Sequence, residues 1–188
     1  MAERLRARLM QDTNLYPAGM PPPTDPKFRS IPGIPVGTVL RDRKECSKVG
    51  LHGPPVAGIW GTPELGAFSI VASGGYEDDR DEGEVLIYTG TGGQIDSYKG
   101  NNVQTKDQTF NHQDNMALKK SVETRRPVRV IRGHTYNSKY APREGYRYDG
   151  DYIVVRAYLA PGKSGFKVCK YELRRVPKPG QLPIPTKI

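Results

Sequence analysis

Residues 151–174, DYIVVRAYLAPGKSGFKVCKYELR, contain the clearest structural pattern in the chain. Two runs rich in β-branched and aromatic residues lie on either side of PGKSG at 161–165. Residues of the first kind favour strands, and glycine and proline favour turns. The pattern therefore predicts an antiparallel hairpin whose strands occupy 151–159 and 165–174.

Working outward from this hairpin, five more segments have the composition of strands and are bounded mostly by Gly, Pro or Asp. They lie at 35–42, 55–60, 66–72, 84–88 and 127–132. One helix is predicted at 112–123, with Asn111 as its N-cap and Asp114 near the positive end of its dipole. The sum is a mostly β (α+β) fold, predicted to be a β-barrel with one or two helices outside it.

The length of 188 residues fits one domain with appendages. Residues 1–30 are predicted to be a basic, proline-rich extension, residues 31–176 the domain, and residues 177–188 a proline-rich tail. No apolar run is long enough to span a membrane. Two cysteines are too few for a disulfide scaffold, so a reducing compartment is expected.

The formal net charge of +9 favours an anionic partner, most simply a nucleic acid. Basic residues dominate between Lys119 and Arg147, and together with Lys163, Lys167 and Lys170 they are candidates for phosphate contacts. Against this background SGGYEDDRDEGE, residues 73–84, has six carboxylates. The contrast suggests a positive surface beside a small acidic pocket, although an acidic run of this kind also fits a solvated loop.

The motifs of common enzymes and metal sites are incomplete. Asp79, Asp81 and Gly83 resemble part of a calcium loop, but the other ligands and the flanking helices are missing. YTGTGGQ at 88–94 lacks the Lys-Ser/Thr of a phosphate-binding P-loop. The three histidines share no metal spacing, and no Ser–His or Cys–His pair is detectable. The sequence therefore predicts no catalysis, no metal and no cofactor.

Three ordered stretches together resemble one family. They are IPGIPVGTVLRDRKECSKVGLHGPPVAGIWG (31–61), GAFSIVASGGYEDDRDEGEVLIYTGTGG (66–93) and NSKYAPREGYRYDGDYIVVRAYLAPGKSGFKVCKYELRR (137–175). They are similar to the SET- and RING-associated (SRA) domain, also called the YDG domain after the triplet found here at Tyr148-Asp149-Gly150. The resemblance implies a PUA-like β-barrel that binds 5-methylcytosine in DNA and flips the base out of the duplex.

The resemblance also implies a site. The flipped base is stacked between tyrosines that match Tyr76 and Tyr88, and its N4 amino group is bound by a carboxylate that matches Asp79. Gly74 and Gly75 allow a close approach of the backbone to the base. The pocket edge and the methyl niche are expected to be lined by Ser73, Thr89 and Thr91, with Ser73 standing where known relatives have alanine. The other acids of the run are interpreted as solvated, turn or capping residues.

Two loops are implied outside the pocket. A thumb that fills the hole left by the base matches Pro55, Val56, Ala57 and Gly58, with Val56 as the wedge. A second DNA-contacting loop at 94–106 has no arginine where the vertebrate ligase members have an Asn-Lys-Arg finger. Its candidate contacts are Lys99, Asn101, Asn102 and Gln104, and preference for CG context and for hemimethylated sites is left open. The YDG triplet itself is interpreted as structural, with a buried ring and a tight turn.

The expected partner is therefore double-stranded DNA with methylated cytosine in the nucleus, with histones or chromatin-modifying proteins as further partners. Two alternatives of other classes are kept. One is the reader part of a modification-dependent nuclease, which needs a separate catalytic domain. The other is a PUA-like barrel that binds RNA or protein without base flipping.

Overall fold

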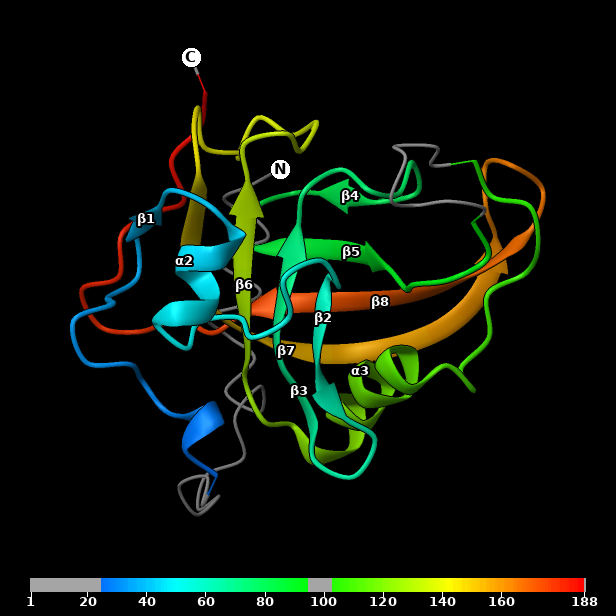
Figure 1. The fold of residues 1–188 in the computed structure, drawn as a ribbon, viewed down its shortest axis with the longest axis horizontal. Helices are drawn as coiled ribbons and strands as arrows, with labels where there is room; N and C mark the ends of the chain where they lie inside the picture. The colour runs from blue at the N-terminus through cyan, green and yellow to red at the C-terminus, as the bar shows by residue number, and fades with distance from the viewer. Residues whose placement is uncertain (1–24, 95–102, 188) are drawn as a thin grey trace.

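An eight-stranded sheet forms the body of the structure, a computed structural model that describes residues 25–94 and 103–187 (Figure 1). The elements in chain order are η1 (Pro26–Phe28), β1 (Val39–Leu40), α2 (Arg43–Lys48), β2 (Ile59–Thr62), β3 (Gly66–Ala72), β4 (Arg80–Asp81), β5 (Val85–Thr89), α3 (Gln113–Thr124), β6 (Val128–Gly133), β7 (Tyr146–Pro161) and β8 (Lys167–Arg175). The mostly β class with two α-helices agrees with the prediction, and β3 coincides with the predicted segment.

The predicted hairpin is confirmed as β7 and β8, which pair antiparallel from Tyr152↔Arg175 to Pro161↔Lys167. A register shift between Val154 and Arg156 interrupts the ladder. β7 begins at Tyr146, earlier than predicted, so Tyr148-Asp149-Gly150 lies inside a strand. The expected tight turn at the triplet is therefore wrong, because residues 146 and 147 already pair with β1 and β6.

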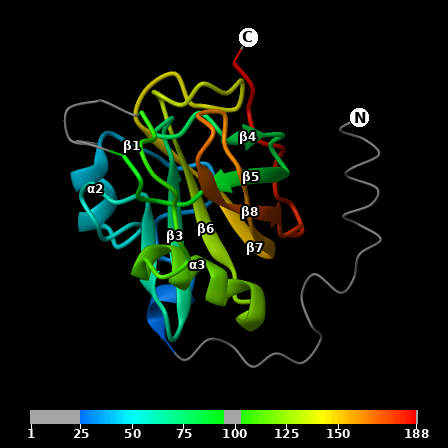
Figure 2. The same cartoon turned by 90° about the vertical axis from the view of Figure 1, so that its right-hand side faces the viewer.

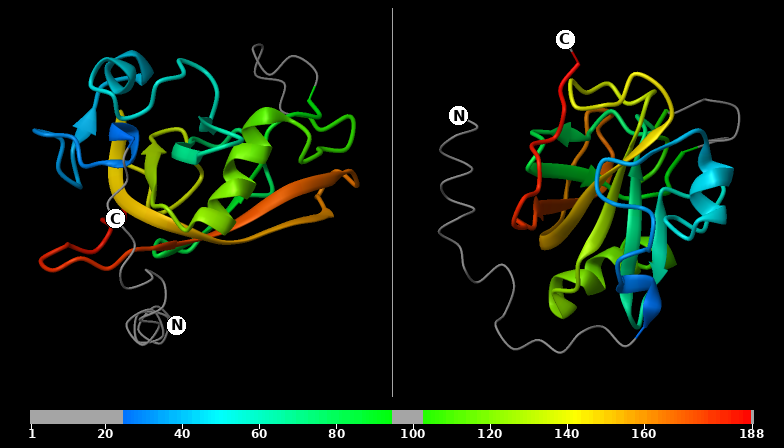
Figure 3. Two further views of the ribbon diagram at one scale, coloured as in Figure 1. Left: turned by 90° about the horizontal axis from the view of Figure 1, so that it is seen from below. Right: turned by 90° about the vertical axis from the view of Figure 1, so that its left-hand side faces the viewer.

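Closure into a barrel by hydrogen bonding is not found. The strand order is β2-β3-β6-β7-β8-β5-β4, with β1 paired to β7, and no ladder joins β2 to β4 within the described residues. The sheet is instead open and strongly curved, with β7 as a long bent band (Figures 2 and 3). The curvature brings β5 near β3, since the Tyr88 hydroxyl donates to the carbonyl of Val71 at 3.1 Å.

β3 and β6 run parallel to each other inside the sheet, and both are buried on their two faces. Successive residues point to opposite faces of a strand. Ile70 and Val130 accordingly belong to the main core, whereas Val71 and Ile131 belong to a second core that includes Leu40, Cys46 and Tyr148. Continuous apolar runs such as 66–72 are the sequence signature of this double burial.

The two helices occupy different sides of the molecule. α3 packs against β2, β3 and β7 through Leu118 and its neighbours, and its N-cap is His112 and not the predicted Asn111. The imidazole Nδ1 of His112 accepts the backbone N–H of Asp114 at 3.2 Å. α2 was not predicted. Its signal is a capping pattern, in which Asp42 accepts the N–H of Glu45 and Glu45 accepts the N–H of Arg41.

Residues outside both predicted ends of the domain, residues 31 and 176, pack against the sheet or its core. Phe28 lies edge-on against Phe68, with ring centroids 4.9 Å apart. Ile184, within the segment expected to be a tail, is 7% exposed and belongs to the main core. We therefore propose that the folded unit is wider than 31–176 at both ends. No helix in the described part of the chain is long and apolar enough to cross a bilayer.

Candidate functional site

The pocket loop, residues 73–81, runs from the end of β3 into β4 and carries the acidic run. Its acids are bound and not merely solvated. Glu77 accepts the hydroxyl of Ser164 at 2.6 Å, and Asp78 accepts the N–H of Lys163 at 2.9 Å. Both donors belong to the turn between β7 and β8. The predicted hairpin turn thus supports the loop that holds the candidate site.

Asp79 is partly buried and is held from one side only. Its Oδ1 accepts the backbone N–H of Thr89 at 2.7 Å, and its Oδ2 has no partner among the described residues. Burial raises the pKa of Asp79 to about 7, and the neighbouring Thr89 opposes this shift through its side chain and its backbone N–H. A carboxyl oxygen with no partner in a partly dry site is suited to accept a hydrogen bond from a ligand.

The two predicted tyrosines are both fixed through their hydroxyls. Tyr88, on β5, is 5% exposed and donates to Val71 as described above. Tyr76, in the pocket loop, accepts the N–H of Gly92 at 3.1 Å and donates to Thr91 Oγ1 at 3.4 Å. The ring orientations are therefore set before any ligand binds, which lowers the entropic cost of stacking a planar group on them.

Two hydroxyl groups near these residues are buried and unused. Thr89 Oγ1 and the Tyr136 hydroxyl have no hydrogen-bond partner in the described structure. Buried polar atoms are normally paired, so each of these is available to a water molecule or a ligand. Tyr136 was missed because its only sequence signal is an aromatic residue in a polar loop. Gly75, by contrast, faces open space, since a Cβ there would meet nothing within 4 Å.

The segment after β5 is shaped by two buried amides that the sequence did not single out. Asn115 of α3 accepts the N–H of Thr91 at 2.8 Å and donates to its carbonyl at 2.9 Å. Gln108 donates to the carbonyls of Gly90 and Gly92 at 2.8 and 3.2 Å. These bonds replace the ladder partners that the chain loses when β5 ends. They place Thr91 beside the Tyr76 hydroxyl.

Asp81 is the second correction in the acidic run, because it is buried in an ion network and is not solvated. It is a turn residue as expected, since its Oδ1 also accepts the N–H of Gly83 at 2.9 Å. Arg132 Nε and Nη2 donate to its two oxygens at 2.9 and 2.8 Å. Arg132 Nη1 donates to Asp149 Oδ2 and to the Tyr152 hydroxyl, and Nη2 also donates to the carbonyl of Gly83. All five guanidinium donors are therefore used. The acid of the YDG triplet is connected to the pocket loop through this one arginine.

The thumb residues lie in the loop between α2 and β2. Val56 is 56% exposed at its tip, and Pro55 is also exposed. Arg43 of α2 donates to the carbonyls of Pro54 and Ala57 at 2.9 and 2.6 Å. Gly58 packs on the pocket, since a Cβ there would lie 2.5 Å from the Tyr88 hydroxyl. The loop is thus fastened at its base while its apolar tip faces solvent.

A buried histidine is hydrogen-bonded to the backbone of the thumb loop. His52 Nε2 lies 2.8 Å from the carbonyl of Ala57, and Nδ1 lies 2.7 Å from Ser69 Oγ. A carbonyl only accepts, so Nε2 carries the proton and Nδ1 accepts from the serine. Burial lowers the pKa of His52 to about 3. The ring is therefore neutral and structural.

The second predicted loop is only partly described. Lys99, Asn101 and Asn102 lie outside the described residues. Gln104 is described and corrects the prediction: it is 7% exposed, and its amide donates to the carbonyls of Gly92 and Lys106 at 3.1 and 2.8 Å. Its side chain braces the segment after β5, so it is not available to contact a base.

The basic stretch from Lys119 to Arg147 is also corrected in part. Arg129, Arg132 and Arg147 are buried and bind carbonyls or carboxylates within the fold. These three arginines are therefore excluded as phosphate contacts. The exposed members of the stretch, such as Lys119 and Arg143, stay candidates.

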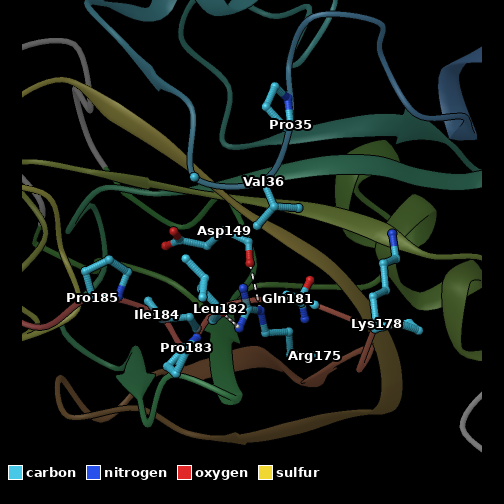
Figure 4. A pocket seen from close by; sticks show the side chains of 13 residues that line it. Pro35, Val36, Asp149, Arg175, Lys178, Gln181, Leu182, Pro183, Ile184 and Pro185 are labelled. Atoms are coloured by element: carbon cyan, nitrogen blue, oxygen red, sulfur yellow. Dashed lines mark hydrogen bonds between the residues drawn. The ribbon is translucent and has the colours of Figure 1, made fainter.

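A hollow of about 430 Å³ lies elsewhere, between the strand that carries Asp149 and the C-terminal segment (Figure 4). Its charged walls are already paired, since Arg175 contacts Glu84 at 3.3 Å and Lys178 contacts Asp151 at 2.7 Å. It shares no lining residue with the pocket loop or the thumb. We assign no ligand to it.

The raised pKa of Asp79 predicts a pH dependence of stability. Because the pKa in the folded state lies above the ordinary value near 4, folding favours the protonated acid. This contribution is complete at low pH and is lost as the pH rises toward and through 7. Asp79→Asn is expected to flatten the decline in stability between about pH 5 and about pH 8. Urea unfolding at several pH values measures this, and Glu82→Gln, an exposed acid nearby, should keep the wild-type slope.

The chain is similar to known proteins in sequence and in structure. A model of the SAD/SRA domain matches residues 27–179. The chain is 49% identical over 164 residues to the UHRF1-like protein of Cryptococcus neoformans var. grubii, covering 83% of this chain and 48% of that protein. It thus spans about half of this curated relative.

Two solved structures are similar. The SRA domain of SUVH5 in complex with methylated CHH DNA has a TM-score of 0.67 and 40% identity, with 83% of this chain and 97% of that chain covered. The modification-dependent TagI restriction endonuclease has a TM-score of 0.75 and 42% identity, with 79% and 52% covered. From the length of the family match and the identity to these relatives, the chain belongs to the SAD/SRA domain family.

Proposed function

We propose that the chain binds double-stranded DNA that contains 5-methylcytosine and holds the modified base outside the duplex, in a pocket formed by Tyr76, Asp79 and Tyr88. The observation that carries this proposal is the Asp79 carboxyl, whose pKa burial raises and whose Oδ2 lies outside the hydrogen bond from the Thr89 N–H, whereas Glu77 and Asp78 are bound to the turn between β7 and β8. The similar SUVH5 SRA domain, solved with methylated DNA, supports the choice of ligand.

The chemistry of the pocket matches cytosine. Stacking on an aromatic ring is worth about 1–3 kcal/mol per base, which offsets the few kcal/mol that flipping costs. The N4 amino group of cytosine donates to Asp79 Oδ2, whereas thymine presents O4, which the carboxylate repels. N3 of cytosine needs a donor. A protonated Asp79 or one of the unused hydroxyls of Thr89 and Tyr136 supplies it.

The thumb completes the mechanism. Val56 enters the gap that the base leaves and prevents the stack from closing, because an apolar side chain between base pairs replaces part of the lost stacking. The carbonyls behind it are bound by Arg43 and His52, so the wedge acts from a rigid base. The chain is proposed to act as a nuclear reader without catalysis of its own.

The test is a binding panel of unmodified, hemimethylated, fully methylated and hydroxymethylated duplexes in CG and non-CG contexts. Methylated duplexes are expected to bind more tightly than unmodified ones at one salt concentration. A 2-aminopurine beside the target base should brighten on binding, and Val56→Gly should reduce this rise while leaving the contacts to the backbone. Equal affinity for all duplexes, or stronger binding of a competing RNA, would contradict the proposal.

A second candidate is the reader part of a modification-dependent nuclease, which the similarity to TagI favours. In that case cleavage belongs to another part of the protein. Methylated plasmid incubated with Mg²⁺ and this chain alone should stay intact. Cleavage by the chain itself would show that the proposal of a reader without catalysis is wrong.

A further inference from the structure

An open groove of about 860 Å³ lies beside the thumb, between α2 and the chain segments that flank the loop after β6. α2 contributes Lys44 and Lys48 to it, and the opposite side is formed by His134 and Tyr146, whose rings pack edge to face. Pro55 of the thumb also lines the groove. The groove and the wedge residue Val56 are therefore parts of one continuous surface.

Basic side chains outnumber acidic ones in the lining of the groove. Lys44 and Lys48 are four residues apart on α2, which places them on the same side of the helix. Both are exposed, and neither forms an ion pair within the described residues. The only acid in the lining is Asp42, which caps the helix at Glu45 and lies 3.4 Å from Arg41. A solvent-facing pair of lysines next to a cationic arginine attracts anions.

The position of these charges relative to the thumb is fixed. Arg43 lies between Asp42 and Lys44, and its guanidinium binds three carbonyls of the thumb loop, those of Pro54, Val56 and Ala57. The helix and the thumb thus form one unit. A duplex that receives Val56 between its bases must present the neighbouring sugar–phosphate backbone close to α2.

We propose that this groove is a docking surface for the phosphodiester backbone of the same DNA duplex, with Lys44 and Lys48 each neutralising a phosphate. The inference rests on the proposed function and adds Lys44 and Lys48, which lie outside the basic stretch at 119–147. The two lysines are expected to raise the affinity for any duplex and not to select a base, because contacts to phosphate position a duplex without reading its sequence.

The test is the salt dependence of binding by Lys44→Gln/Lys48→Gln. The slope of log K against log[salt] between about 50 and about 200 mM should become shallower by about 0.9 for each lysine removed. Affinity should fall by a similar factor for methylated and unmodified duplexes. Lys44→Arg/Lys48→Arg should keep the slope. Lys178→Gln/Lys187→Gln in the C-terminal segment removes two exposed lysines outside every proposed phosphate contact and is the control for loss of charge.

The outcomes separate the two proposals. If wild type prefers methylated duplex and the α2 double variant keeps the wild-type slope, the groove does not bind the backbone. A loss equal to that of the Lys178→Gln/Lys187→Gln variant overturns the inference too, since it then reflects net charge alone. If wild type shows no preference for methylated duplex, the proposed function fails, whatever the slopes show. Circular dichroism confirms that each variant is folded, which the exposure of the lysines leads us to expect.

Discussion

Replacing Asp79 with alanine is expected to weaken binding of methylated duplex by about 10- to 100-fold, because a hydrogen bond to a charged group is worth about 1.5–3 kcal/mol. The flipped base would also leave its N4 amino group buried without a partner, which adds a desolvation cost. Loss of the methyl group from the substrate removes only about 0.8 kcal/mol of transfer free energy, or about 1–3 kcal/mol in a fitted pocket. Asp79 is therefore expected to matter for every cytosine, and the methyl group for the choice among them.

The measurement is a titration at one salt concentration with wild type on methylated and unmodified duplex and Asp79→Ala on methylated duplex. Glu82→Ala is the matched control, because Glu82 is an exposed acid in the same run whose one ion pair among residues 25–94 and 103–187 is with Arg80. It removes the same charge from the same surface. If both variants bind methylated duplex as tightly as wild type, Asp79 does not read the base.

The substitution Arg132→Lys is expected to lower both stability and discrimination. Lysine keeps the charge but has three donors where arginine has five, so at least two buried hydrogen bonds are lost, although each acceptor keeps another partner. A hydrogen bond with a charged group contributes about 1.5–3 kcal/mol, and the expected loss of unfolding free energy is therefore about 3–6 kcal/mol. Because Asp81 anchors the loop that carries Tyr76 and Asp79, the ratio of methylated to unmodified affinity should also fall.

Arg129→Lys is the control for this prediction. Arg129 lies on the same strand, is 4% exposed and binds the carbonyls of Gly50 and Arg29, well away from the pocket loop. It should lose stability and keep the wild-type affinity ratio. Urea unfolding and the same titrations, run where both variants are folded, separate the two effects. An unchanged ratio for Arg132→Lys would mean that the ion network stabilises the fold and does not affect discrimination between duplexes.

Ser138→Ala, which removes one 2.6 Å bond to Asp81, provides a milder variant should Arg132→Lys not fold.

The parts of the fold that were predictable are those whose signal is local. The hairpin at β7 and β8, the buried strand β3 and the helix α3 can each be recognised from the composition or the hydrophobic period of their own residues. Barrel closure was not predictable, because it depends on whether the two ends of the sheet meet. Short elements such as β1 and α2 are stabilised by their contacts with β7 and the thumb, and propensity alone does not specify them.

The candidate site also has parts that were predictable from the sequence and parts that were not. Tyr76, Asp79 and Tyr88 were predicted through a family resemblance, and their common pocket is a proposal. The burial of Asp81 and Gln104 was not predictable, because an acid in a polar run and a glutamine in a loop look solvated until distant partners are known. Asp81 is paired with Arg132, 51 residues away in the sequence. Asn115 and Tyr136 contribute through tertiary contacts that leave no motif.

The C-terminal segment has a mechanical consequence for the pocket. The backbone N–H of Lys187 donates to the carbonyl of Lys139 at 2.6 Å, next to Ser138, whose hydroxyl braces Asp81. A load applied beyond Lys187 therefore reaches the pocket loop through two residues and one side chain. Ile184 holds the same segment in the main core. The C-terminal segment and the loop that carries Asp79 are thereby mechanically coupled.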